Sequence, residues 1–436
     1  METTQINYEN EQNNLIIQPN EKPKNIFVWI LLSLQHVFAM FGATVLVPFI
    51  IGLDPSIAIL SSGIGTLVYI ACTKGKVPIY LGSSFAFITA TSIAFKAGGH
   101  GAVAAALIGV GLVYIVISII LRFTGMNWIN RVIPPIVIGP MIMVIGLSLA
   151  SGAVGNAGLA EGEFNITYAA IACFTLLITA LTSIIGKGFF KIIPILVGIL
   201  SGYVFSLILG VVDTSIFSNM TLFSIPNIQI PGITYSFDFT YVAMFLPIAL
   251  VTIAEHIGEH SITSNICKKD FLKDPGLKNT LLGDGLASII AGLIGGPANT
   301  TYGENNGVIA MTKVASVYVI GLAAIFAIVL AFINPVSLFI KSIPSPVMGG
   351  ISIMLFGIIA SNGVKIMIEN RIDFTQSRNL VIAATMLVLG IGGATFAFSE
   401  TFSLAGMSAA AVVGIILNLV LPKDKNYEDS IVEKEL

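Results

Sequence analysis

The chain has 436 residues, of which 55% are hydrophobic and only 10% are charged, and its formal net charge is −2. Soluble domains carry roughly 25% charged residues, so this composition excludes an ordinary soluble protein and favours an all-α integral membrane protein. We expect a lipid bilayer around the chain and no nucleic-acid partner. The three cysteines are scattered along the sequence and predict no disulfide framework.

In chain order, residues 1–25 are polar and lack the basic start, apolar core and cleavage site of a signal peptide, so we expect a disordered cytoplasmic tail. Apolar runs of about 17 to 25 residues, the length of a membrane-spanning helix, follow. Uninterrupted spans are predicted at 27–50, 54–72, 101–121, 132–151, 166–186, 191–212, 240–262, 279–294, 315–333, 345–362, 376–394 and 402–421. Two further stretches, 77–95 and 298–313, are interrupted by Gly, Pro, Ser, Thr and Asn. We expect these to be broken spans 3 and 10 with short extended segments, which makes fourteen transmembrane spans.

The distribution of basic residues tests this number, because Lys and Arg accumulate on the cytoplasmic loops of membrane proteins. With both termini in the cytoplasm, fourteen spans put every basic residue on that side except Lys96 and Lys341. A miscounted span would reverse every loop after it. We therefore expect a multi-pass protein of the cell (inner) membrane with both termini cytoplasmic.

The chain also contains an internal repeat. Residues 133–154 ("IPPIVIGPMIMVIGLSLASGAV") and 343–364 ("IPSPVMGGISIMLFGIIASNGV") align without gaps. These are spans 5 and 12, and their odd separation means that the second copy enters the membrane from the opposite face. The sequence therefore predicts a 7+7 inverted repeat. Interrupted spans at corresponding places in two inverted halves, here 77–95 and 298–313, point to the central site of a transporter.

Ionisable residues gather in otherwise apolar segments. The acidic candidates are Glu255, Glu259, Asp284 and Glu304. An Asp or Glu at the bilayer centre costs at least about 2.5 kcal/mol on insertion scales and usually carries function. Glu255 and Glu259 are four residues apart and lie on one helix face. Two close carboxylates in a low-dielectric site cannot both ionise cheaply, so one of them is expected to bind a proton.

Four residues are candidates for proton coupling: Glu259, His260, Asp284 and His36. Alternatives remain at each of the weaker positions. His36 and His256 are also compatible with histidines that are merely satisfied in a core. Asp284 lies in "LLGDGLAS", where a purely structural role as a cap or local hydrogen-bond acceptor is as good an interpretation.

The stretch "HIGEH" (256–260) matches the H-x-x-E-H pattern, in which two histidines on one helix face bind zinc. This motif keeps a divalent-metal transporter or a membrane metalloprotease open as alternatives, with Glu304 as a possible third ligand. No cluster of Cys or further His supplies other ligands, so we expect no resident metal, no cofactor and no enzymatic activity. No nucleotide-binding P-loop is present, which disfavours transport driven by ATP.

The segments "YLGSSFAFIT", "AEHIG" and especially "NTTYGENNGVIAMTKVAS" resemble the bacterial uracil permeases of the nucleobase-ascorbate transporter family. The resemblance implies a proton symporter that is commonly a homodimer. It also implies a core domain of spans 1–4 and 8–11 and a gate domain of spans 5–7 and 12–14. In this chain the core would comprise 26–125 and 236–334, and the gate 126–235 and 335–421. Residues 422–436 would form a second cytoplasmic tail.

The resemblance also implies a binding site for uracil. Glu255 and Glu304 would hold the base through their carboxylates, and the backbone N–H groups of Phe85 and Gly303 would donate to its carbonyl oxygens. Uracil has two N–H donors and two C=O acceptors, so this set of groups matches its rim. Phe85 and Tyr302 could also flank the ring.

One departure from the family pattern affects the substrate. Uracil permeases typically carry a histidine four residues after the first glutamate, whereas this chain has Glu259 there and His260 one place later. Purine members put an acid at that position and another resembling Asp284, so a xanthine or urate permease is the alternative. Glutamate at Glu304 favours uracil, because purine members usually have glutamine. An anion transporter of similar architecture is disfavoured because the predicted spans contain no central Lys or Arg.

Overall fold

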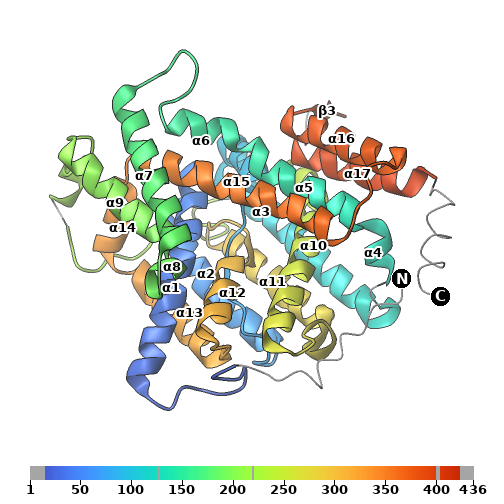
Figure 1. Ribbon diagram of the computed structural model, residues 1–436, viewed down its shortest axis with the longest axis horizontal. Coiled ribbons are helices and arrows are strands. Elements are labelled where there is room, and N and C mark those ends of the chain that lie inside the picture. The colour runs from blue at the N-terminus through green and yellow to red at the C-terminus, as the bar shows by residue number, and fades with distance from the viewer. Residues whose placement is uncertain (1–14, 126, 219, 399–402, 423–436) are drawn as a thin grey trace. The chain divides into compact units, whose positions relative to one another are not determined.

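The computed structural model describes residues 15–125, 127–218, 220–398 and 403–422 (Figure 1). Within these ranges, seven helical stretches are long and apolar enough to cross a membrane. They are Ile26–Ile51, Pro55–Cys72, Ile88–Thr124, Pro135–Asn156, Ile166–Ile185, Val242–Cys267 and Ser345–Glu369. Shorter apolar helices occupy Pro194–Ile208, Val317–Ala331, Ser377–Ile391 and Met407–Val420. The chain is thus mostly helical, as expected, while the number of fourteen spans and the 7+7 repeat stay predictions.

The chain divides into two compact units. Unit 1 comprises Met1–Phe123 and Ser151–Met354, and unit 2 comprises Thr124–Ala150 and Leu355–Leu436. The predicted core and gate domains have other boundaries and stay a prediction. The outer parts of the two predicted tails, 1–14 and 423–436, lie outside the described residues.

Unit 1 is built almost entirely of helices. Its elements in chain order are α1 (Ile26–Ile51), α2 (Pro55–Cys72), β1 (Leu81–Ser83), α3 (Ile88–Thr124), α6 (Ala150–Asn156), α7 (Ile166–Ile185), α8 (Phe189–Ile192), α9 (Pro194–Ile208), the 3₁₀ turn η2 (Ser215–Phe217), α10 (Val242–Cys267), the π turn η3 (Leu272–Gly276), α11 (Leu277–Leu293), β2 (Asn299–Thr301), α12 (Gly303–Thr312), α13 (Val317–Ala331), α14 (Asn334–Ser342) and the first part of α15 (Ser345–Glu369).

Local sequence explains where the first helices begin and end. The side chain of Asn25 accepts the backbone N–H of Phe27 and so caps the start of α1. At the other end, Gly52 adopts a left-handed conformation (φ 89°), which glycine tolerates without strain. Asp54 then caps α2 by accepting the N–H of Ser56, and Pro55 takes the first helical position, where no N–H is needed. The turn between the two helices is therefore encoded within three residues.

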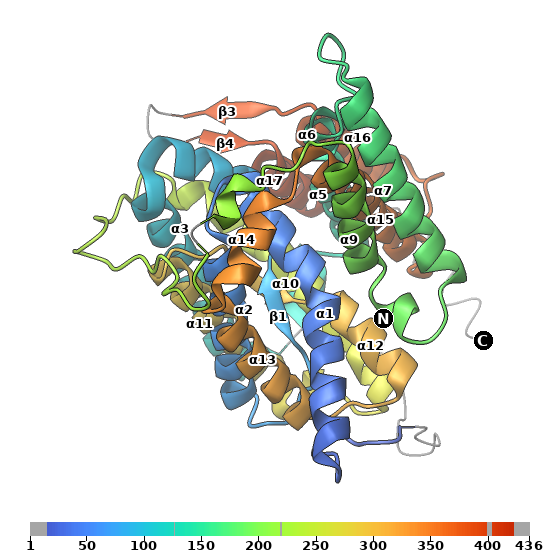
Figure 2. The same cartoon turned by 90° about the vertical axis from the view of Figure 1, so that its left-hand side faces the viewer.

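Two short strands lie in the stretches where the broken spans were predicted, and they pair with each other. β1 and β2 pair antiparallel, with Leu81 opposite Thr301 and Ser83 opposite Asn299. Figure 2 shows β1 beside α1, and α1 packs against both β1 and α12. The expected short extended segments are therefore present, and each is followed by a helix, α3 after β1 and α12 after β2. The helix α3 also contains a kink at Gly99, where φ is positive.

The tyrosine that follows β2 fills the space beside β1. A Cβ added at Gly82 would collide with the ring of Tyr302, so only glycine lets this ring lie flat against the strand. The Tyr302 hydroxyl donates to the carbonyl oxygen of Ser83 at 3.0 Å. On the other side of β1, the hydroxyl oxygen of Thr66 accepts the N–H of Leu81 at 2.9 Å. These side chains satisfy backbone groups that a helix would have satisfied internally.

Residues 15–21, which we name the N-terminal strap, lie along the segment between α12 and α13. The N–H of Ile16 donates to the carbonyl oxygen of Lys313 (2.8 Å), and the N–H of Ala315 donates to the carbonyl oxygen of Ile17 (3.0 Å). Leu15 packs against a buried apolar cluster that includes Ile309 and Ala315. This part of the predicted tail is therefore bound to the body of unit 1.

Unit 2 contains α4 (Asn127–Val132), α5 (Pro135–Ser148), the remainder of α15, α16 (Ser377–Ile391), β3 (Thr395–Ala397), β4 (Ser403–Ala405) and α17 (Met407–Val420). Glycines let α5 and α15 approach closely: a Cβ at Gly139 would collide with Met367, and one at Gly146 with the backbone of Phe356. The antiparallel pairing of β3 with β4 was not predicted. Residue 402, the first residue of the predicted span 402–421, lies outside the described residues.

Candidate functional site

Three helices of unit 1 bring the predicted acidic residues together. Glu255 and Glu259 lie one turn apart on α10, Asp284 lies on α11, and Glu304 lies in the first turn of α12. Glu255 is within electrostatic range of the other three carboxyl groups. Asp284 is fully buried, whereas Glu255, Glu259 and Glu304 are half-buried. The grouping that the sequence predicted from separate segments is therefore present in the structure.

The carboxylate of Glu259, which belongs to α10, lies beside the first turn of α12. Its Oε2 accepts a hydrogen bond from the side-chain amide of Asn306 at 2.7 Å. A Cβ added at Gly303 would lie 2.9 Å from Oε1 of Glu259, so the absence of a side chain there makes room for the carboxylate. The first N–H groups of a helix have no helical acceptor and form the positive end of its dipole. The N-terminal end of α12 is thus a favourable place for a carboxylate.

The two predicted backbone donors occupy the turns that lead into helices. Gly303 is the first residue of α12, directly after β2. Phe85 is half-buried and lies in the turn between β1 and α3, where its carbonyl oxygen accepts the N–H of Ile88 at 3.2 Å. Tyr302 is 3% exposed, and its side chain is directed at Gly82 and Ser83.

His256 and Asp284 form a buried pair. Nδ1 of His256 lies 2.9 Å from Oδ2 of Asp284, and Nε2 of His256 lies 2.9 Å from the hydroxyl oxygen of Thr280. The Thr280 hydroxyl donates to the carbonyl oxygen of Leu277 at 3.1 Å, so its oxygen is left to accept the N–H of Nε2. The contact between Nδ1 and Oδ2 then contains one proton, either on an imidazolium or on a neutral carboxylic acid. This pair can store and release a single proton.

The remaining histidines of the region are also held by specific partners. Nδ1 of His260 donates to the carbonyl oxygen of His256 at 2.7 Å, and its Nε2 is hydrogen-bonded to the hydroxyl of Tyr69. On α1, Nδ1 of His36 accepts the side-chain amide of Asn305 at 3.0 Å. His36 is therefore linked to the residue that follows Glu304 on α12.

Two glycines flank Asp284, and because they have no side chains, two tyrosines can pack against them. A Cβ at Gly283 would lie 2.9 Å from Cδ2 of Tyr69, and a Cβ at Gly285 would lie 2.7 Å from Cβ of Tyr114. The stretch "GDG" thus lets one aromatic residue from α2 and one from α3 approach the backbone next to Asp284. Sequence reasoning missed both tyrosines, although the two glycines around a buried acid indicate close approach of neighbouring segments.

The same reasoning missed Thr280, Asn305 and Asn306, which bind His256, His36 and Glu259. The two asparagines could have been identified as candidates from their position in the sequence. They directly follow Glu304 at the start of a short helix with few apolar residues, and polar side chains within a membrane are expected to find partners.

The zinc interpretation of "HIGEH" conflicts with the geometry. Both ring nitrogens of His256 and both of His260 already have hydrogen-bond partners, so binding zinc there would break those contacts. Among the described residues, no group of three or more His, Cys, Asp or Glu side chains is arranged to hold a metal ion.

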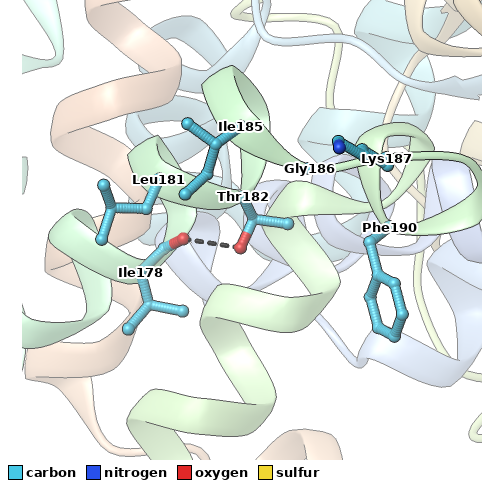
Figure 3. A pocket seen from close by; sticks show the side chains of 7 residues that line it. All are labelled: Ile178, Leu181, Thr182, Ile185, Gly186, Lys187 and Phe190. Atoms are coloured by element: carbon cyan, nitrogen blue, oxygen red, sulfur yellow. Dashed lines mark hydrogen bonds between the residues drawn. The ribbon is translucent and has the colours of Figure 1, made fainter.

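A surface pocket of unit 1 lies elsewhere, at the end of α7 and around α8 (Figure 3). It is lined by Ile178, Leu181, Thr182, Ile185, Gly186, Lys187 and Phe190. The Thr182 hydroxyl donates to the carbonyl oxygen of Ile178 at 2.7 Å and is therefore occupied. The other side chains are apolar except Lys187. This pocket lacks the acidic and amide groups that distinguish the region around Glu255.

Solved structures share this fold at low sequence identity. The transmembrane domain of the cyanobacterial bicarbonate transporter BicA aligns with a TM-score of 0.57 and 14% identity, over 92% of this chain and 98% of that one. The murine anion transporter Slc26a9 aligns with a TM-score of 0.67 and 10% identity, over 92% of this chain and 69% of that one. Together with the apolar helices, this likeness gives the chain the fold of a membrane transport protein.

Sequence comparison then gives the family. The family model described as Permease family (Xan_ur_permease) matches residues 27–398, and the chain belongs to this family of integral membrane permeases. It is 46% identical to the uracil permease of Bacillus caldolyticus over 97% of this chain and 98% of that protein. It is 45% identical to the uracil permease of Bacillus subtilis (strain 168) over 94% of this chain and 96% of that protein. It is 43% identical to the uracil permease of Escherichia coli (strain K12) over 89% of this chain and 90% of that protein.

Proposed function

We propose that this permease imports uracil together with protons across the cell (inner) membrane. Uracil permeases that align with nearly the whole chain support the substrate. The observation that carries the proposal is the arrangement of Glu255 and Glu304. Both are half-buried carboxyl groups on different helices of one unit, and Glu304 lies beside the N-terminal end of α12. The Glu304 carboxylate accepts its own backbone N–H, which leaves further lone pairs for a ligand, and the Glu255 carboxylate lies within electrostatic range of it.

The binding chemistry follows from the rim of the base. The carboxylates of Glu255 and Glu304 accept its two N–H groups, and the backbone N–H groups of Phe85 and Gly303 donate to its carbonyl oxygens. Charge-assisted hydrogen bonds of this kind contribute about 1.5–3 kcal/mol each. Tyr302 supports this site through β1, against which its ring packs.

Proton coupling is assigned to Glu259, His260, Asp284 and His36. The Asp284–His256 contact contains one exchangeable proton, and Glu259, one turn from Glu255 on α10, accepts a hydrogen bond from Asn306 of α12. Neutralising one of several neighbouring acids lowers their mutual repulsion and favours the loaded carrier. Proton entry down its gradient would thereby be linked to entry of the base.

The transport cycle in this proposal is alternating access by a core domain, 26–125 and 236–334, that rocks against a gate domain, 126–235 and 335–421. The chain would cross the membrane fourteen times as a 7+7 inverted repeat, with both termini cytoplasmic, and would work as a homodimer. The positive charges on alternate loops and the repeat of 133–154 at 343–364 support this topology.

Uptake of radiolabelled uracil into proteoliposomes tests the function. Purified protein should accumulate uracil when the outside is more acidic than the inside. Accumulation should disappear when a protonophore removes the gradient, while exchange of labelled for unlabelled uracil should continue. Exchange without any response to the gradient would contradict proton coupling, and absence of both would contradict the substrate.

A second candidate is a xanthine or urate permease, which the acid at Glu259 favours because purine members have an acid there. Competition decides between the two. Excess xanthine or urate should leave uracil uptake unchanged if uracil is the substrate, and should abolish it if the site is built for purines.

A further inference from the structure

Tyr69 is a fully buried residue of α2 whose hydroxyl is bonded to Nε2 of His260 on α10. Its ring lies close to Gly283 and belongs to a buried apolar cluster with Val77 and Phe271. Neither the family resemblance nor the proposed substrate contacts involve this tyrosine. Its buried hydroxyl is nevertheless bonded to a histidine next to the acidic cluster.

The hydrogen bonds of His260 determine which of its nitrogens carries hydrogen. The carbonyl oxygen of His256 can only accept, so Nδ1 of His260 must donate to it. In a neutral imidazole Nε2 is then an acceptor, and the hydroxyl of Tyr69 is its donor. Tyr69 therefore holds His260 as a neutral ring in one tautomer and one orientation.

The orientation of His260 in turn determines that of His256. The two rings stack with their centroids 4.0 Å apart and an interplanar angle of 28°. The two ring nitrogens of His256 are held by Asp284 and Thr280. His256 is thus fixed between the His260 ring and these two partners, and its Nδ1 cannot turn away from the carboxylate without displacing His260.

We propose that Tyr69 is a positioning residue for proton coupling, which acts through His260 to keep His256 aligned with Asp284. This inference rests on the proposed proton symport. Without the Tyr69 hydroxyl, Nε2 of His260 loses its donor, the His260 ring is free to turn, and the stacked His256 ring loses its support. The proton between Nδ1 of His256 and Oδ2 of Asp284 is then held less firmly. Transport should need a higher proton concentration to fill this pair.

Several other titratable groups face these residues and share their environment. Asp284 on α11 interacts electrostatically with Tyr69 and with Tyr114 on α3, and Cys72 on α2 interacts with Tyr69. Glu255 on α10 interacts with Tyr114 and with Glu259 and Glu304, and Cys267 of α10 lies in the apolar cluster beside Tyr69. Tyr69→Phe leaves all of these side chains in place. A comparison in a His260→Gln background separates the contact with His260 from the interaction of Tyr69 with Asp284.

The test compares Tyr69→Phe with the wild-type protein in proteoliposomes. Uracil exchange at equal pH should continue, because substrate contacts are unchanged and exchange needs no net proton movement. The midpoint of the pH dependence of gradient-driven uptake should move by about one unit to lower pH, the size expected for loss of one buried hydrogen bond. In a His260→Gln background, Tyr69→Phe should add no further shift, since its effect passes through that ring.

Tyr80→Phe is the matched control, because Tyr80 is equally buried in unit 1 and its hydroxyl contacts Ser62 instead of a histidine. It should leave the pH dependence unchanged. The proposal is wrong if Tyr69→Phe keeps the wild-type pH dependence, if it abolishes exchange together with driven uptake, or if Tyr80→Phe produces the same shift. A wild-type protein that exchanges uracil but ignores the pH gradient would instead overturn proton symport itself.

Discussion

Oδ2 of Asp284 lies 2.9 Å from Nδ1 of His256, and both side chains are completely buried. Removing two isolated charges from water costs several kcal/mol per ion, and close pairing offsets part of that cost. With one proton between them the pair has no net charge, whereas without it the pair leaves a buried negative charge. Loss of the proton is therefore more costly at this buried pair than at an exposed acid.

Asp284→Asn tests this role. Asparagine has nearly the same shape and still hydrogen-bonds to His256, but it cannot take up and release a proton. We expect gradient-driven accumulation of uracil to fall on the order of ten-fold, which corresponds to about 1.4 kcal/mol, while exchange at equal pH continues. Proteoliposome uptake and exchange assays, run side by side, measure both quantities.

Asp213→Asn serves as the comparison for this substitution. Asp213 is exposed after α9, and the hydroxyl and N–H of Ser215 lower its pKa, so it stays ionised over the pH range of the assay. Because this carboxylate neither titrates there nor faces the acidic cluster, its replacement should change neither accumulation nor exchange. Full accumulation by Asp284→Asn would show that the buried pair does not carry the coupled proton.

Much of the fold could be predicted because the bilayer imposes strong rules on sequence. Helices lie in each predicted uninterrupted range, and strands β1 and β2 lie in the interrupted stretches 77–95 and 298–313. The register of these strands and the contact of Tyr302 with Gly82 could not be predicted, because they join positions far apart in sequence. The pairing of β3 with β4 and the binding of the N-terminal strap are likewise contacts that no single segment encodes.

The candidate site was predictable where charge conflicts with an apolar surrounding. Glu255, Glu259 and Asp284 stand out for that reason, because burying an acid is costly unless it has a function or partner. Neutral partners give no such signal. Thr280 bonds to the backbone of its own helix as well as to His256. In the sequence Tyr69 looks like any aromatic residue of an apolar helix, because only the structure shows that its hydroxyl is bonded to His260.

Glu255→Gln and Glu304→Gln should each weaken uracil binding. A glutamine oxygen still accepts a hydrogen bond, but without the negative charge the bond loses about 1–2 kcal/mol, which corresponds to roughly five- to thirty-fold in Kd. Titration calorimetry of detergent-solubilised protein with uracil measures this directly.

Glu369→Gln provides the matched substitution on an exposed surface, where Glu369 lies 3.6 Å from Lys365 on the same helix. Uracil affinity should be unchanged there, because exposed pairs of this kind contribute little. Wild-type affinity in both Glu255→Gln and Glu304→Gln would remove these carboxylates from the binding site.

Gly82→Ala should destabilise unit 1. The added methyl group would collide with the buried ring of Tyr302, and overpacking of this type costs about 1–3 kcal/mol. Gly307→Ala on α12 is the control, because Gly307 is exposed, has a negative φ and has no atom within 4 Å of an added Cβ. It should leave stability unchanged or raise it by up to about 1 kcal/mol. Thermal unfolding in detergent compares the two, and equal melting temperatures would contradict the packing of Tyr302 against β1.

The N-terminal strap offers a test in which neighbouring residues should behave differently. Leu15 packs against the buried cluster, whereas the side chain of Ile16 is 74% exposed and only its backbone bonds to Lys313. Leu15→Asp places a charge against apolar side chains and should destabilise by about 2 kcal/mol, while Ile16→Asp should stay within about 0.5 kcal/mol of wild type. Since Lys313 caps the end of α12, loss of the strap should loosen the helix that begins at Gly303. Hydrogen exchange of α12 amides should therefore increase in Leu15→Asp alone, and equal protection in both variants would mean that the strap does not support this helix.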